Sequence, residues 1–385
     1  MSDFGGPEFG LSEEQELLRD TVRRFAEERI RPGLRERDQA HEFPREVLAE
    51  MGEMGLLGMM VPEEYGGAGM DALSYLLAVE ELARVCPSVA VTMSVTNSVC
   101  CWPIWSFGSE NLHRGPLAEL ASGRALGGFG LTEPGSGSDV GSMRTTARRD
   151  GNSWVLDGEK AWITNAGEAR YFVVFARTDP GAGKRGISAF VVSADTPGFS
   201  VGASEEKLGL RASKTAAIQF EACRIPADHL LGEEGQGFKI ALATLGHSRL
   251  GIAAQALGIH TRALELATAY SRERVQFGVP IAQHQAIQFK IATLATELAA
   301  SRALVYRAGA QAHELRGPVY AAQAKLYASE AANRAVWESL QIHGGNGFSE
   351  EYEIARLYRD VRVTTIYEGT SEMQRLVIAR GLVSN

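Results

Sequence analysis

The first part of the chain carries apolar residues at helical spacing. Over residues 11–31 they recur every three or four positions, and Ser12 with Gln15 forms a capping box that favours a helix start. A shorter helical pattern covers residues 45–55, and another covers residues 71–87. These patterns predict that the N-terminal part of the chain is all-helical.

The pattern changes near Ala125. Residues 171–176 (YFVVFA) and 187–193 (ISAFVVS) are short aromatic and β-branched runs, which predict strands. Asp-Gly, Asp-Pro and Pro-Gly pairs around these runs indicate turns. Because no helical pattern alternates with these strands, a parallel doubly wound sheet is disfavoured and a small all-β domain is expected.

Helical signals return at Gln236 and continue to the end of the chain. The final helix is expected from Ser371, with Ser371 and Gln374 as a second capping box. Long Ala- and Leu-rich stretches cover residues 236–269, 281–315 and 318–342. Four helices with short connections favour an antiparallel bundle.

The three patterns together predict a multidomain α+β chain. We expect an N-terminal α-helical domain over residues 1–121, a middle β-barrel-like domain over residues 122–233, and a C-terminal four-helix bundle over residues 234–385. A chain of 385 residues is longer than one compact core usually holds, which agrees with two or three domains.

Charge and composition exclude several classes of protein. The 39 basic and 47 acidic residues leave a formal net charge of −8, which disfavours nucleic-acid binding. No apolar run approaches the roughly 20 residues that span a bilayer, so no membrane segment is expected. Residues 1–10 contain no basic residue and match neither a signal nor a transit peptide. The expected location is the cytoplasm, or the mitochondrial matrix only if a transit peptide has been removed.

The cysteines and histidines indicate no metal site and no disulfide framework. The four cysteines form no CxxC pair, and the histidines show neither HxxxH nor HExxH spacing. The cysteines are Cys86, Cys100, Cys101 and Cys223.

Five segments contain residue types that suit a cofactor or a substrate. A Gly/Ser loop offers N–H groups and hydroxyls to phosphate or flavin oxygens, and an arginine can bind a pyrophosphate with two hydrogen bonds. Taken singly, the segments are also typical of a turn, a core tryptophan, a linker, a helix C-cap and a solvated loop acid. They are Phe129–Ser138 (FGLTEPGSGS), Lys160–Asn165 (KAWITN), Arg272–Gln285 (RERVQFGVPIAQHQ), Gln341–Phe348 (QIHGGNGF) and Ile366–Glu372 (IYEGTSE).

In this order and at these spacings, the five segments resemble the acyl-CoA dehydrogenase family, over nearly the whole chain from Leu11 to Ala379. The helix–β–helix order matches the fold of that family. The resemblance implies FAD-dependent α,β-dehydrogenation of an acyl-CoA thioester to the trans-2-enoyl-CoA, as in fatty-acid β-oxidation. It also implies a homo-oligomer, in the family usually a tetramer, and an electron-transferring flavoprotein as electron acceptor.

The resemblance assigns roles to particular residues. It implies that Ser138 also contacts the substrate, with Arg249 and Gly369. The implied FAD contacts within the segments are Phe129, Leu131, Thr132, Gly137, Ser138, Trp162, Ile163, Thr164, Thr370 and Glu372, and those reached across a subunit interface are Arg274, Phe277, Gln285, Gln341, Gly344 and Gly345.

Glu368 is implied to abstract the α-proton while FAD N5 accepts the β-hydride. Some family members carry the base just before the arginine that Arg249 matches, but Ser248 stands there, which excludes the isovaleryl- and long-chain-type placement. Glutaryl-type members carry an arginine near Ala90, which this chain lacks. A short- or medium-chain type is therefore expected, with branched and aromatic acyl groups left open.

Other functions also stay open. A flavin-dependent oxidase or monooxygenase on the same fold is one alternative, and a non-catalytic helical assembly is another. Two residues depart from the family pattern. Gly246 replaces an acid near Arg249, which affects the expected CoA contacts. Trp102 stands where a small residue is usual, so it reshapes the acyl pocket or simply packs in the core.

Overall fold

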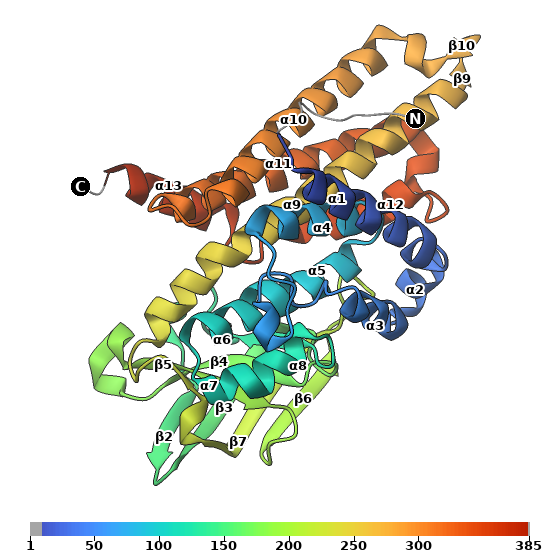
Figure 1. The fold of residues 1–385 in the computed structure, drawn as a ribbon. Coiled ribbons are helices and arrows are strands. Elements are labelled where there is room, and N and C mark those ends of the chain that lie inside the picture. Colours follow the sequence, from blue (N-terminus) through green and yellow to red (C-terminus); the bar gives the residue numbers. More distant parts are fainter. Residues whose placement is uncertain (1–9, 384–385) are drawn as a thin grey trace.

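The computed structural model describes residues 10–383 (Figure 1). Residues 1–9, in which no targeting signal was expected, lie outside this described part. Within residues 10–383, no helix is long and apolar enough to cross a membrane. The same residues contain no group of three His, Cys, Asp or Glu side chains that could hold a metal ion. All four cysteines are buried free thiols.

The N-terminal part is helical, as the sequence pattern predicts. Helix α1 (Glu13–Phe25) begins where Ser12 and Gln15 exchange the two hydrogen bonds of a capping box, which confirms the predicted start. Asp71 caps α4 (Ala72–Val85) by accepting the Ser74 N–H at 2.7 Å. The other helices are η1 (Ala26–Ile30), α2 (Leu34–Ala40), α3 (Arg45–Glu53), η2 (Glu63–Tyr65), α5 (Pro87–Val95), η3 (Thr96–Cys101), α6 (Trp102–Phe107), α7 (Glu110–Leu112), η4 (His113–Leu117) and α8 (Ala118–Ala121).

An eight-stranded sheet forms the middle part, in the order β6-β7-β3-β2-β4-β5-β8, with β1 paired in parallel to β4. Both predicted strands are present, as β4 (Tyr171–Arg177) and β5 (Ile187–Ser193). The remaining strands are β1 (Gly127–Gly130), β2 (Thr146–Asp150), β3 (Ser153–Thr164), β6 (Phe199–Ser204), β7 (Thr215–Pro226) and β8 (Leu230–Leu231). Short 3₁₀ turns lie between them, namely η5 (Val140–Ser142), η6 (Pro180–Gly186) and η7 (Ala227–His229).

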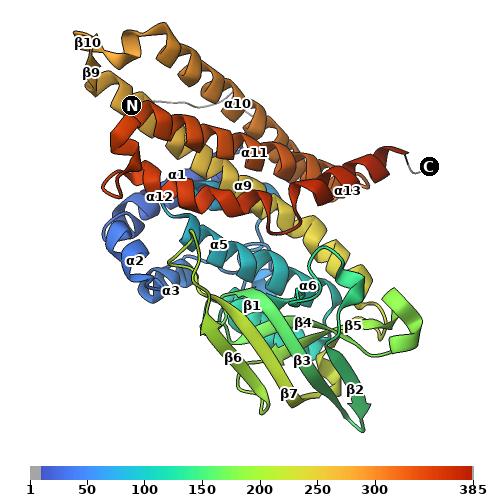
Figure 2. The same ribbon diagram turned by 180° about the vertical axis from the view of Figure 1, so that it is seen from behind.

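The C-terminal part contains the four predicted long helices. They are α9 (Gly237–Glu273), α10 (Gln285–Ala310), α11 (Gly317–His343) and α13 (Ser371–Val383). A small hairpin of β9 (Val275–Gln276) and β10 (Val279–Pro280), followed by η8 (Ile281–Gln283), joins α9 to α10. Between α11 and α13 lie η9 (Gly344–Phe348), a short helix α12 (Glu353–Val361) that was not predicted, and η10 (Arg362–Thr365). Figures 1 and 2 show the hairpin and the sheet at opposite ends of the molecule.

The predicted capping box at the start of α13 is wrong. Ser371 is the first residue of the helix, and its hydroxyl has no hydrogen-bond partner within the described part of the chain. The Thr370 hydroxyl instead accepts the N–H of Met373, in the first turn of α13, at 3.4 Å. Gln374 donates to the carbonyls of Gly369 at 2.7 Å and Glu368 at 3.2 Å. This one-residue shift leaves the Gln374 side chain free to hold the preceding loop.

Helix α9 runs through the centre of the molecule and crosses α4 at close range. A Cβ added to Gly258 would lie 2.2 Å from the Glu80 carbonyl oxygen and 2.8 Å from the Arg84 nitrogen. Such distances are below van der Waals contact, so the crossing requires a glycine at this point. Gly246, on the same helix, has no heavy atom within 4 Å of the corresponding position.

These two glycines form a matched pair for a stability test. We expect Gly258→Ala to lower the free energy of unfolding by about 1–3 kcal/mol, because α9 and α4 must separate. Gly246→Ala should raise it by up to about 1 kcal/mol, because alanine is the better helix former. Denaturant unfolding of both variants measures this, and equal changes for the two would contradict the close crossing.

Candidate active site

Glu368 lies in the loop between η10 and α13. Its φ is +52° and that of Gly369 is +89°, so two successive residues are left-handed. This conformation is uncommon for a residue with a side chain, and it turns the chain sharply. The turn brings the carboxylate to α9, where Ser248 donates its Oγ–H to Glu368 Oε2 at 2.5 Å.

The surroundings of Glu368 act on its charge in two directions. Partial burial raises the pKa of the carboxyl group above its ordinary value. The hydrogen bond from Ser248 and the positive charges of Arg249 and Lys325 oppose that rise. A carboxylate with a raised pKa holds an abstracted proton better than a solvated glutamate does, which suits a general base.

Arg249 is the next residue on α9 and is only 6% exposed. Its Nε has no hydrogen-bond partner in residues 10–383. Burial lowers the pKa of the guanidinium, and the Glu368 carboxylate acts against that shift. A buried cation with an unused donor can bind a polar or anionic part of a ligand.

Lys325 and Gln374 hold the backbone of the Glu368 turn. Lys325 is fully buried in α11, and its Nζ donates to the Gly369 carbonyl at 2.7 Å, as Gln374 Nε2 also does at 2.7 Å. Neither contact was predicted. The signal that could have shown Lys325 is a lysine inside the Ala-rich run AAQAKLYAS, because a buried lysine needs a partner.

Glu133 anchors the loop over residues 129–139. Its carboxylate accepts the N–H groups of Arg144 at 2.6 Å and Thr145 at 2.9 Å, and the ammonium of Lys160 at 2.7 Å. Burial lowers the pKa of Lys160 to about 8, and the Glu133 charge acts against that shift. Because every oxygen of Glu133 is used inside the protein, its role is to shape the loop.

The anchored loop lies beside an irregularity in β3. Ala161 donates its N–H to the Thr132 carbonyl at 2.9 Å. The pairing of β3 with β7 shifts register between Lys160 and Ile163, and Trp162 has a φ of +61°. The bulge turns Trp162 outward, where its residue is 62% exposed, while Ile163 stays buried.

These residues fit a flavin. Trp162 presents a flat apolar face, and Gly135 and Gly137 have no heavy atom within 4 Å of an added Cβ, so the loop is open on its outer side. Backbone N–H groups and hydroxyls along such an open loop can bind flavin and phosphate oxygens. Among the other predicted contacts, Leu131 is buried, Phe129, Thr132 and Thr164 are partly buried, and Ser138 is exposed.

A small apolar cluster joins this loop to Glu368. Phe129 of β1 and Tyr367, the neighbour of Glu368, pack against the same buried side chains. The structure therefore brings the predicted flavin segment and the predicted base together where the three parts of the chain meet. The buried members of the cluster are Val91, Val95, Val99 and Leu210.

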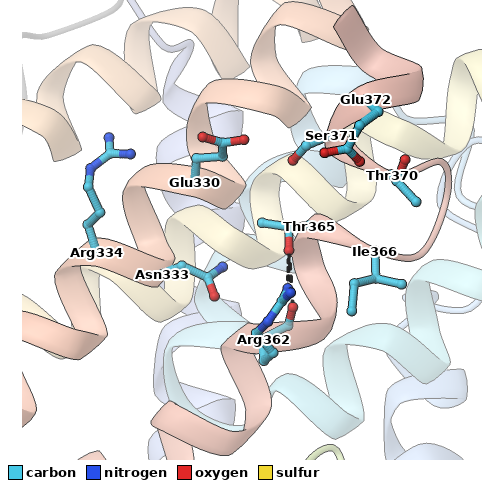
Figure 3. Close-up of a pocket in the computed structure, with 9 residues that line it drawn as sticks. All are labelled: Glu330, Asn333, Arg334, Arg362, Thr365, Ile366, Thr370, Ser371 and Glu372. Atoms are coloured by element: carbon cyan, nitrogen blue, oxygen red, sulfur yellow. Dashed lines mark hydrogen bonds between the residues drawn. The ribbon is translucent and has the colours of Figure 1, made fainter.

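Thr370 and Glu372 line a hollow of about 410 Å³ next to the Glu368 loop (Figure 3). Glu330 and Arg334 of α11 and Arg362 of η10 form its other sides. Two of the predicted FAD contacts therefore face open space beside the base.

The remaining predicted FAD contacts lie at the far end of the helical bundle. Arg274, Phe277 and the pair 344–345 line one hollow of about 420 Å³, and Phe277 is 95% exposed. Gln285 and Gln341 are exposed on the adjoining helix ends. Gln276 and Phe277 of the β9–β10 hairpin are among the residues that line this hollow, and the hairpin lies away from the sheet in both views (Figures 1 and 2). One chain therefore does not bring these residues to Trp162.

Trp102 packs against His247 of α9, the residue that precedes Ser248. Its ring stacks on His247, with centroids 4.9 Å apart and planes at 11°, and it meets Phe107 edge-on at 5.8 Å. Burial lowers the pKa of His247 to about 4, so the stacked imidazole is neutral. Trp102 is only partly buried, so packing does not account for its whole surface.

Comparisons with known proteins agree with this arrangement. Acyl-CoA dehydrogenase domain families match the chain at residues 12–124 (N-terminal domain), 128–223 (middle domain) and 235–383 (C-terminal domain). The chain is 50% identical over 377 residues to the mitochondrial short-chain specific acyl-CoA dehydrogenase of Bos taurus, covering 97% of this chain and 91% of that protein.

Solved structures are similar over the same extent. Butyryl-CoA dehydrogenase from Megasphaera elsdenii has a TM-score of 0.95 and 43% identity, covering 97% of this chain and 99% of that one. A glutaryl-CoA dehydrogenase from Mycobacterium smegmatis in complex with FADH2 has a TM-score of 0.91 and 36% identity, covering 97% and 96%. The chain therefore belongs to the acyl-CoA dehydrogenase family and is an FAD-dependent oxidoreductase that acts on acyl-CoA thioesters.

Proposed function

We propose that Glu368 removes the α-proton of the acyl-CoA thioester, so that the product is the trans-2-enoyl-CoA. Bound FAD supplies the acceptor for the β-hydrogen, which leaves as hydride. The observation that carries this proposal is the place of the carboxylate, partly buried and 2.5 Å from the Ser248 hydroxyl, with Arg249 and Lys325 beside it.

The protein must keep this carboxylate ionised until the proton is taken. Burial raises the pKa of this carboxyl group and so favours the protonated form, whereas the two nearby cations favour the charged form. Ser248 donates a hydrogen bond where some relatives carry the base, so it supports the Glu368 carboxylate and does not compete with it. Residues 129–138 and 162–164 would hold the flavin against this site.

Glu368→Gln should slow flavin reduction by about 100-fold or more, because a general base contributes roughly 10²–10⁴ in rate. Anaerobic loss of flavin absorbance after addition of butyryl-CoA measures it, with Glu351→Gln as an exposed-acid control. In the wild type the reduction rate should rise with pH, with a midpoint above the value of about 4.3 for a free glutamate, because burial raises the pKa of Glu368.

Reduction of Glu368→Gln at the wild-type rate would show that another group is the base. Turnover in air with no added acceptor would instead support the oxidase alternative. The acceptor we propose is an electron-transferring flavoprotein, as implied by the family.

We also propose a short straight-chain acyl group. The bovine relative is named as short-chain specific, and Tyr367, the neighbour of Glu368, packs against the buried apolar cluster of Val91, Val95, Val99 and Leu210.

Butyryl-CoA should therefore reduce the flavin with a kcat/KM at least about 10-fold above that of octanoyl-CoA. Each extra methylene that finds no room in the site loses roughly 1 kcal/mol of favourable burial. A panel of acyl-CoAs, including branched and aromatic ones, measures the profile. Trp102→Gly should favour longer chains if Trp102 limits the pocket, and an unchanged profile would assign Trp102 to packing on His247. A wild-type preference for octanoyl-CoA would contradict the short pocket.

We further propose that each FAD site is built from two subunits of a homo-oligomer, in the family a tetramer. Ser248 and Arg274 are 26 positions apart along the chain that forms α9, which is about 39 Å at 1.5 Å per residue. That separation exceeds the reach of one dinucleotide. If both regions contact FAD, the Arg274 hollow must therefore come from a second copy.

Co-expression of two inactive variants tests this arrangement. Arg274→Glu should abolish FAD binding at every site of its own oligomer, and Glu368→Gln should abolish proton abstraction. A hybrid places wild-type Glu368 from one chain against wild-type Arg274 from the other, so activity should return. The measurement is flavin reduction by purified differently tagged hybrids, and hybrids as inactive as both parents would contradict a shared site.

A further inference from the structure

The backbone that carries Glu368 is held from two helices. The Gly369 carbonyl accepts Lys325 Nζ from α11 and Gln374 Nε2 from α13, each at 2.7 Å. Gln374 also donates to the Glu368 carbonyl at 3.2 Å. Both carbonyls of the left-handed turn are thus fixed by side chains, in a loop that has no regular secondary structure of its own.

The turn would not be expected to keep this conformation unaided. Glu368 is a side-chain-bearing residue at a φ of +52°, and a Cβ at Gly369 would lie 2.8 Å from Gln374 Nε2. A conformation of this kind is unfavourable for a residue with a side chain and persists only where surrounding contacts enforce it. Lys325 is fully buried, and its ammonium donates a hydrogen bond to this turn. Removing an ammonium from water is unfavourable, so this contact compensates for part of that penalty.

We propose that Lys325 is a positioning residue for the dehydrogenation, whose ammonium fixes the Gly369 carbonyl and supplies a buried positive charge beside the Glu368 carboxylate. This inference rests on the proposed role of Glu368 as the base. Lys325 has no place among the predicted site residues, and it reaches the turn from a helix 43 positions earlier in the chain.

The charged and titratable groups around Glu368 come from each element packed on it. Arg249 lies on α9, Tyr75 on α4 and Lys325 on α11, with Tyr367 adjacent in the loop. Lys325 in turn feels Arg249, Glu330 and Glu372. Arg249 has an unused donor that can bind the ligand. The ammonium of Lys325 is instead held by a hydrogen bond to the backbone carbonyl of Gly369.

Removal of the Lys325 charge should shift the pKa of Glu368 in one direction. A cation near a carboxylate lowers the pKa of that carboxylate, so its loss raises the pKa of Glu368. Since the ionised form is the base, the curve of flavin-reduction rate against pH then moves to higher pH. Removing only the hydrogen bond would lower the maximal rate and leave the midpoint of that curve unchanged.

The test uses the FAD-loaded full-length protein and anaerobic flavin reduction by butyryl-CoA across a pH series. Lys325→Met should lower the maximal rate by about 10–100-fold, because the base is misplaced, and move the midpoint up by about one pH unit. Lys325→Gln should recover part of the rate, because it keeps a donor, with the midpoint still shifted. Gln374→Met should lower the rate without a shift. Lys290→Met, which loses an ammonium contact to Glu338 away from the site, is the control and should behave like wild type.

A wild-type rate and midpoint in Lys325→Met would overturn the proposal. If that variant does not fold, Lys325→Gln decides, because an unshifted midpoint there is equally fatal to the charge role, and the tightness of butyryl-CoA binding should be unchanged in either case. Failure of the underlying function is distinguishable: Glu368→Gln would then reduce its flavin, whereas failure of the Lys325 role alone leaves Glu368→Gln inactive.

Discussion

The site depends on how closely α9 can lie against its neighbours. Small residues set that distance: a Cβ on Gly251 would lie 2.3 Å from the Tyr75 hydroxyl oxygen, and one on Gly258 would lie 2.2 Å from the Glu80 carbonyl oxygen. Ser248 is less than one helical turn from Gly251. The close approach of α9 at Gly251 therefore also sets the position of the Ser248 hydroxyl that donates to Glu368. Larger side chains at Gly251 and Gly258 would push α9 away from its neighbours and move the Ser248 hydroxyl out of hydrogen-bond range.

Glu133 and Glu368 are two carboxylates near lysine side chains, and their different surroundings suit them to different roles. Glu133 uses both oxygens on backbone N–H groups and on Lys160, and this complete set fixes the loop beside Trp162. The Glu368 carboxylate accepts a hydrogen bond from Ser248, and within residues 10–383 Arg249 and Lys325 act on its charge without forming an ion pair with it. A fully paired carboxylate is a poor base, because each donor stabilises the ionised form. The incomplete pairing of Glu368 leaves it able to take a proton.

The sequence predicted the order of the three parts, the long helices, the two central strands and the five segments, because these depend on local patterns and on motif spacing. It did not predict Lys325, whose contact with Gly369 joins two helices far apart in the chain. It placed the α13 cap one residue late, since Thr370 and Ser371 are both suitable caps by composition and only the turn at Gly369 decides between them. Helix α12 was missed although its nine residues, EIARLYRDV, place charged and apolar side chains at helical spacing, because the run is short.

Three of the five segments that carry predicted site residues contain a non-glycine residue with positive φ, namely Trp162, Phe277 or Glu368. Among non-glycine residues with positive φ in the described chain are Trp162, Leu210, Phe277 and Glu368. Each is an awkward choice for that conformation on steric grounds, and glycine would relieve it. Glycine, however, would supply neither the exposed rings of Trp162 and Phe277, nor the buried apolar side chain of Leu210, nor the carboxylate of Glu368. The large helical core and the anchored sheet loop supply the stability that lets these side chains stay in place, which is why the chemistry sits on short loops between long, regular elements.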